Sequence, residues 1–90
     1  MTLNFNKSIE YLINIKNFRG VEELLLCAIK ENCIISFNAS TQFEALNSND
    51  DKLIMLMIEN GYIKKKILNL CWHKLSANIR LLVKVKNTTQ

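Results

Sequence analysis

The chain lacks proline altogether and has only two glycines and one histidine among its 90 residues. The turns and corners of all-β folds draw on proline and glycine, so their scarcity favours helices. Two isolated glycines, Gly20 and Gly61, cannot form the glycine-rich loops that cradle phosphate groups. Leucine and isoleucine together supply 24 residues, evenly spread, which argues against a disordered chain.

Long hydrophobic runs are also missing, and we expect no export signal. The longest apolar runs are LIMLMI at residues 53–58 and LLLCAI at residues 24–29, far shorter than the roughly 20 residues of a membrane span. The N-terminal stretch mixes Glu10 and several asparagines with its apolar residues, unlike a signal peptide. Three cysteines, an odd number without an export signal, point to free thiols in a reducing compartment. We expect a cytoplasmic protein with no membrane partner.

Start and stop signals divide the chain into helical segments. Gly20 and Gly61 fit positions just past helix ends. Thr41 and Glu44 have the three-residue spacing of a capping box, which predicts a helix that begins at Thr41. The predicted helices span residues 6–17, 21–32, 41–46, 51–60 and 62–82.

The segment at residues 51–60 is the predicted centre of the fold. Asn49 or Asp50 can cap it, and its LIMLMI run leaves few polar positions, so it should be the most buried helix. The segment CIISF at residues 33–37 contains two β-branched isoleucines and could be a short strand or a frayed helical turn, but we favour an extended link. No internal repeat is evident. We therefore predict one all-α domain over residues 1–90, a small bundle of three to four helices of ten or more residues, with a short extended segment near residues 33–37.

Charge is segregated along the chain. Residues 1–59 hold five basic and eight acidic groups, whereas residues 60–90 hold seven basic groups and no acid. If residues 62–82 form one helix, at about 100° per residue, a hydrophobic seam and a basic back lie on opposite sides of it. The seam consists of Leu68, Trp72, Leu75, Ile79 and Leu82, and the basic back consists of Lys66, His73, Arg80 and Lys84.

Three interpretations of this basic surface stay open. A solvated helix face needs no partner. A nucleic-acid site would neutralise phosphates and stack a base on Trp72 or Tyr62, although Trp72 belongs to the apolar seam and the net charge of +4 is modest. A docking surface for an acidic protein would use the same charges to steer the encounter.

Catalytic and metal-binding patterns are weak. Cys27, Cys33, Cys71 and His73 are candidate zinc ligands, but their spacings are not the short pairs that zinc sites use. The lone histidine lacks an orienting acid, and a cysteine or serine nucleophile needs such an oriented base. We expect no enzymatic activity, no metal and no cofactor.

The functional hypothesis rests on apolar residues in excess of what a domain of 90 residues can bury. Apolar residues left on the surface in a patch mark a site for a partner. We predict a small protein-binding module, such as an adaptor, secretion-type chaperone, inhibitor or self-associating subunit. Its partner would be another protein or a second copy, and the alternative is a DNA- or RNA-binding regulator. The predicted apolar contact residues are Tyr11, Ile15, Phe18, Ile63, Leu70 and Leu81. The predicted basic face comprises Lys64, Lys65, Lys66, Lys74, Arg80, Lys84 and Lys86.

The cysteine pattern predicts three free thiols and no bound metal. Thiol titration of the denatured protein, without added reductant, should therefore count three thiols. A strong chelator should leave the Tm unchanged, because no ligand set depends on a metal. A drop of several degrees on chelation would contradict this prediction and restore the zinc interpretation.

Overall fold

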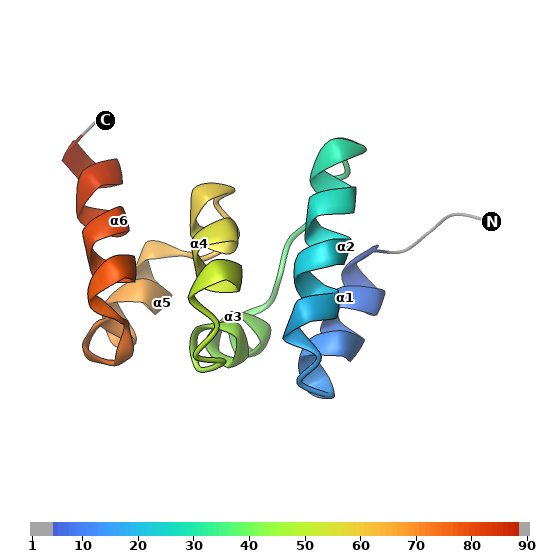
Figure 1. Ribbon diagram of the computed structural model, residues 1–90, viewed down its shortest axis with the longest axis horizontal. Helices are drawn as coiled ribbons and strands as arrows, with labels where there is room; N and C mark the ends of the chain where they lie inside the picture. Colours follow the sequence, from blue (N-terminus) through green and yellow to red (C-terminus); the bar gives the residue numbers. More distant parts are fainter. Residues whose placement is uncertain (1–4, 89–90) are drawn as a thin grey trace.

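Residues 5–88 are described by the computed structural model, and every regular element among them is helical (Figure 1). No strand occurs within this range, and three helices have ten or more residues, so the predicted all-α fold is confirmed. The elements are α1 (Phe5–Asn14), α2 (Phe18–Lys30), α3 (Ala39–Leu46), α4 (Asp51–Glu59), α5 (Lys65–Leu70), the 3-10 helix η1 (Trp72–Lys74) and α6 (Ala77–Thr88).

The helices form two layers. In one layer α4 packs between α2 and α6, and in the other α3 packs between α1 and α5. Figure 1 shows α2, α4 and α6 standing side by side along the longest axis of the molecule, which extends 42 × 27 × 20 Å. The fold is thus a row of three helical pairs, α1–α2, α3–α4 and α5–α6, in which the middle pair has a neighbour on each side.

The second helix of each pair begins with the same type of N-terminal cap, although no repeat is evident in the sequence. A side-chain oxygen before the second helix of each pair accepts a hydrogen bond from the backbone N–H three residues later. The bonds join Asn17 to Gly20 at 3.1 Å, Asp50 to Leu53 at 3.1 Å and Ser76 to Ile79 at 3.3 Å. The chemistry differs at each cap, and the caps are 33 and 26 residues apart, so no fixed period marks the repeat.

Two predicted helix boundaries are wrong. Gly20 does not follow the first helix but lies in the first turn of α2, because Asn17 caps that helix earlier than predicted. Thr41 does not cap α3. Its N–H instead donates to the side chain of Asn38 at 2.8 Å, and Asn38 is the cap. In both places an asparagine satisfies an N-terminal N–H upstream of the predicted start.

The predicted long helix over residues 62–82 is also wrong. The chain leaves α5 after Leu70, forms η1 and turns at Leu75 before α6 begins. Ser76 fixes this turn, because its hydroxyl donates to the Asp51 carboxylate of α4 at 2.8 Å and accepts from the Ile79 N–H. The local sequence carries no proline or glycine here, so the break depends on a contact with a neighbouring pair.

The core is centred on α4, as predicted. Leu53, Ile54, Met57 and Ile58 of this helix are buried against both flanking pairs. Asp50 caps α4, and Gly61 follows it at a φ of +75°, a conformation that favours glycine. The remaining buried hydrophobic residues are Phe5, Ile9, Ile13, Val21, Leu25, Ala28, Ile35, Phe37, Ala45, Leu46, Ile63, Ile67, Leu68, Cys71, Leu75 and Ile79.

A buried amide joins the two links between the pairs. Gln42 of α3 is 2% exposed, and its Nε2 donates to the carbonyl of Phe37 at 2.8 Å. Its Oε1 accepts from the N–H of Lys64 at 2.9 Å. The rings of Phe37 and Tyr62 meet edge to face nearby, with centroids 5.7 Å apart. The segment 33–37 is therefore an irregular link, held by a side chain in place of strand pairing.

Replacing Gln42 with leucine should destabilise the fold by about 2–4 kcal/mol, because it leaves the Phe37 carbonyl and the Lys64 N–H without a partner in a dry site. Urea unfolding followed by circular dichroism measures this loss. Asn60→Ala is the matched control, since the Asn60 amide donates to the Leu56 carbonyl at the same 2.8 Å but is exposed. Equal losses for the two variants would contradict the role assigned to Gln42.

Candidate functional site

The seven basic residues of the predicted face do not act alike. Arg80 fastens α6 to η1, since its Nε donates to the Trp72 carbonyl at 3.0 Å and its Nη2 to the His73 carbonyl at 2.9 Å. Lys86 reaches the end of α4, where its Nζ donates to the carbonyls of Ile58 and Glu59 at 3.1 and 3.2 Å. Cations at helix C-termini satisfy carbonyls that lack an intrahelical partner. These two residues therefore serve the fold.

The other five, Lys64, Lys65, Lys66, Lys74 and Lys84, are exposed. Lys66 lies in α5, Lys74 in η1 and Lys84 in α6, three elements that the chain does not join into one helix. The single basic back predicted for a continuous helix therefore does not exist. What remains is an end of the molecule with a high local density of positive charge.

The apolar candidates fall into three groups. Tyr11 (61% exposed) and Ile15 (53%) lie on α1 and just after it, whereas Leu70 (59%) and Leu81 (62%) lie on α5 and α6. Figure 1 places α1 and α6 at opposite ends of the molecule, so these pairs cannot form one surface.

Ile63 and Phe18 belong to the third group, which faces inward. Ile63 is only 7% exposed, and Phe18 packs partly buried against the core. The structure thus places Ile63 inside the protein and not on the contact surface predicted for it. Its neighbours Tyr62 and Lys64 carry the link that Gln42 ties down, which turns the Ile63 side chain inward.

One exposed apolar residue on α6 was missed in the sequence. Val85 is 51% exposed and follows Leu81 by four residues, so the two share a side of the helix. Lys84 lies between them in sequence and is also exposed. We call Leu81, Lys84 and Val85 the α6 ridge. The four-residue spacing of Leu81 and Val85 was the available signal, but the last predicted helix ended at residue 82.

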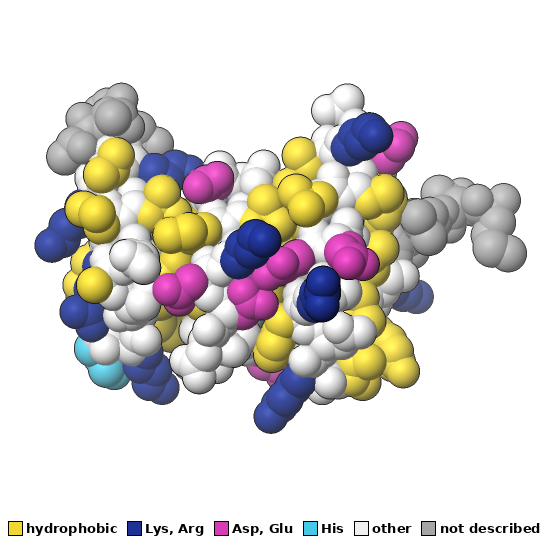
Figure 2. All heavy atoms as spheres, viewed as in Figure 1, with side chains coloured by type: hydrophobic (Ala, Val, Ile, Leu, Met, Phe, Trp, Pro, Cys, Tyr) yellow, Lys and Arg dark blue, Asp and Glu magenta, His cyan; other side chains and the backbone are white. Residues whose placement is uncertain are grey.

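The second and third helical pairs differ in their net charge. Residues 38–59, which include α3 and α4, hold four acidic groups and one lysine, whereas residues 60–86 hold seven basic groups and no acid. Figure 2 shows carboxylates gathered over α2 and α4 in the middle of the visible face, and lysine or arginine along the α6 edge. The third helical pair is therefore the basic part of the described chain, and Lys84 brings one of its charges onto the α6 ridge.

Two carboxylates meet where α2 approaches the start of α4. Burial raises the pKa of Glu22, and the adjacent Asp50 adds to the rise through a side-chain hydrogen bond and its charge. Lys52 and Arg19 oppose the rise without cancelling it. Asp50 must stay in place because it caps α4. The pair is a fixed repulsion between helices and has no third ligand to make a cation site within residues 5–88.

The cysteines are dispersed. Cys27 is exposed, Cys33 is half-buried and Cys71 lies in the core, and all three are free. No group of three metal-binding side chains occurs in the part of the chain that the structure describes. Among the same residues, no helix combines the length and the hydrophobicity needed to cross a membrane.

Comparisons with known proteins found no matching family model, no matching curated protein and no matching solved structure. Function must therefore be argued from the exposed surfaces themselves. The two features that stand out at the C-terminal pair are the α6 ridge and its excess of positive charge.

The Glu22–Asp50 contact predicts a pH-dependent stability difference. Because the folded-state pKa of Glu22 is raised, the folded state binds a proton more tightly than the unfolded state, and stability falls as pH rises through that pKa. Glu22→Gln should therefore stabilise the protein at pH 7 by less than about 1 kcal/mol, given solvent screening. The gain should shrink at about pH 4, where the carboxyl is largely protonated. Urea midpoints at the two pH values measure this.

The control for this prediction is Glu23→Gln, because Glu23 is the next residue of α2 but is exposed. It changes the net charge equally and should leave the difference between the two pH values close to that of the parent protein. A Glu22→Gln variant that is less stable than the parent at pH 7 would contradict the repulsive contact.

Proposed function

We propose that the protein is a non-enzymatic protein-binding module that docks an acidic partner on the outer side of its C-terminal helical pair. The α6 ridge is the observation that carries this proposal. In a row of helical pairs each inner pair buries its sides against its neighbours, and a terminal pair normally presents polar residues outward. Here α6 packs against α4, and it keeps Leu81 and Val85 more than half exposed.

Charge complementarity favours an acidic partner. Lys84 lies on the ridge itself, and residues 60–86 contribute seven basic groups with no acid. A partner with an apolar helix or strand flanked by carboxylates would bury Leu81 and Val85 while its charges meet Lys84 and Lys74. Burial supplies the affinity, at roughly 25 cal/mol per Å² before association costs. The charges chiefly raise the association rate.

The arrangement of the cations argues against the nucleic-acid alternative. Phosphate binding needs several cations on one face. Arg80 and Lys86 are engaged with backbone carbonyls, and the exposed lysines are divided between α5, η1 and α6. Trp72 and Tyr62, the two candidate base-stacking residues, both pack partly buried against the core. Nucleic-acid binding is therefore the less favoured alternative, and nuclease-sensitive capture in the experiment below would support it.

A photo-crosslinking residue at position 81 should capture a protein in the native host, and the same residue at position 15 should not. Ile15 is a suitable control because it is equally apolar, similarly exposed and at the other end of the molecule. The captured protein is then purified and its binding measured by surface plasmon resonance. Leu81→Asp should weaken binding by about 2 kcal/mol or more, since it removes apolar burial and adds repulsion. Ile15→Asp should change little.

Lys84→Glu should mainly slow association, with the effect reduced at high salt. Nuclease-sensitive capture, or crosslinks at position 15 alone, would overturn the proposal. Capture of a second copy of the chain at position 81 would identify the partner as the protein itself. Equilibrium sedimentation should then show a dimer for the parent protein and a monomer for Leu81→Asp.

A further inference from the structure

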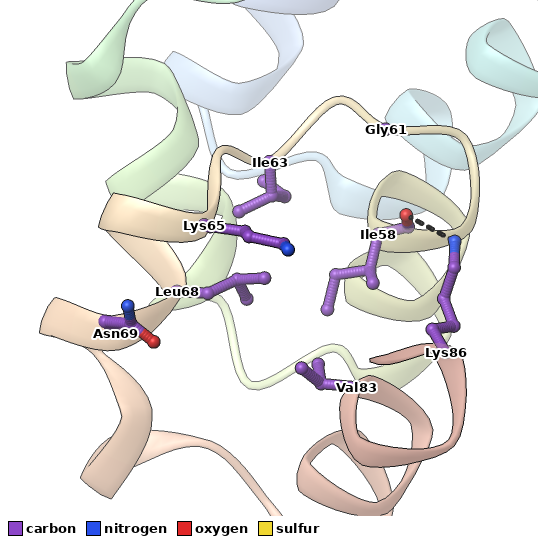
Figure 3. A pocket seen from close by; sticks show the side chains of 8 residues that line it. All are labelled: Ile58, Gly61, Ile63, Lys65, Leu68, Asn69, Val83 and Lys86. Carbon is purple, nitrogen blue, oxygen red and sulfur yellow. Dashed lines mark hydrogen bonds between the residues drawn. The ribbon is translucent and has the colours of Figure 1, made fainter. Parts of the chain in front are cut away.

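A pocket of about 350 Å³ opens between the end of α4, the link that follows it, α5 and α6 (Figure 3). Its volume lies within the range typical of small-molecule sites, roughly 300–1,000 Å³. None of the eight residues that line it is acidic. They are Ile58, Gly61, Ile63, Lys65, Leu68, Asn69, Val83 and Lys86.

The pocket is lined by both apolar and polar residues, and two of its polar side chains are lysines. Ile58, Ile63 and Leu68 are core residues that each keep one side toward the pocket. Figure 3 shows the Lys65 side chain reaching from the start of α5 into the space between them, with its ammonium group near the centre. The Asn69 amide lies at the rim, and Lys86 closes the opposite side.

The two ammonium groups differ in what they can offer. Lys86 is held in place by the carbonyls at the end of α4, and the dashed line in Figure 3 marks its bond to Ile58. No hydrogen bond or ion pair engages the Lys65 side chain within the described residues. The Lys65 ammonium group is therefore available to an anion that enters the pocket.

We propose that this pocket binds a small amphiphilic carboxylate. Its anionic head lies against Lys65, with the Asn69 amide as a second donor, and its hydrocarbon tail lies against Ile58, Leu68 and Val83. A monoanion matches the one available ammonium group of Lys65, whereas a phosphate dianion carries one more negative charge than that group balances. The same chemistry is offered by a free aliphatic acid and by the carboxyl terminus of an apolar peptide.

The pocket is separate from the surface proposed above for a protein partner. Val83 and Lys86 line it from one side of α6, whereas Leu81 and Val85 are on the exposed ridge and do not line it. The two sites can therefore fail independently. A Leu81→Asp variant should keep its response to the carboxylate.

Titration of the full chain with octanoate, followed by NMR of backbone amides and by calorimetry, tests the inference. Octanoate should shift the amides of Gly61, Ile63 and Val83. Octanol and octylamine, which have the same tail without the negative charge, should bind at least about tenfold more weakly. A short apolar peptide with a free carboxyl terminus, compared with its amidated form, tells whether the pocket prefers a peptide end over a free acid.

Lys65→Gln should weaken octanoate binding by about tenfold. Lys66→Gln is the matched control, because Lys66 is the next residue of α5, is exposed and does not line the pocket. Val83→Asn should weaken octanoate and octanol alike, which separates tail binding from head binding. The proposal is overturned if octylamine binds as well as octanoate, if Lys66→Gln has the larger effect, or if millimolar octanoate shifts no amide around the pocket.

Discussion

The side chain of Gln42 is the contact on which the arrangement of the three helical pairs depends. It lies in the middle pair, and its amide bonds the link before α3 on one side and the link before α5 on the other. Each link carries irregular backbone into the interior, where a polar group without a partner is costly. One planar amide with a donor and an acceptor satisfies both links at once. It thereby connects the middle pair to the links on both of its sides.

The third pair is held to the second by polar contacts at both ends of α4. Near the start of α4, Asp51 accepts from Ser76, which caps α6. At its end, Lys86 donates to the carbonyls of Ile58 and Glu59. Between these points Leu53, Met57 and Ile79 fill the core. The burial supplies most of the stabilisation, and the polar contacts select one register of α6 against α4.

Some of the basic residues in the C-terminal part of the chain stabilise the fold and are not available to a partner. A count of seven basic groups in residues 60–90 suggests a broad cationic face, but Arg80 and Lys86 neutralise helix ends within the fold. Of the exposed lysines, Lys84 lies on the α6 ridge and Lys65 lines the pocket, and the two surfaces use different sides of α6. Helical periodicity places Leu81 and Val85 together and Val83 on another side. One helix can therefore serve two surfaces of different chemistry.

The sequence by itself determined what depends on neighbours within one or two turns. The scarcity of glycine and proline predicted an all-α fold, Asp50 and Gly61 marked the bounds of α4, and the LIMLMI run marked it as the centre. Exposure of Leu70 and Leu81 was also foreseen, because both lie off the hydrophobic seam. Caps and periodicity are local properties, so the chain encodes them directly.

Tertiary contacts decided the rest. The break between α5 and α6 escaped detection because Leu68, Leu75 and Ile79 keep helical spacing across it, and both arms bury them in the same core. Only the Asp51 carboxylate, 25 residues before Ser76, shows where the chain turns. The burial of Ile63 and the engagement of Lys86 likewise depend on residues distant in sequence. A local pattern fixes which side of a segment is apolar, but the partner that covers that side is chosen by packing.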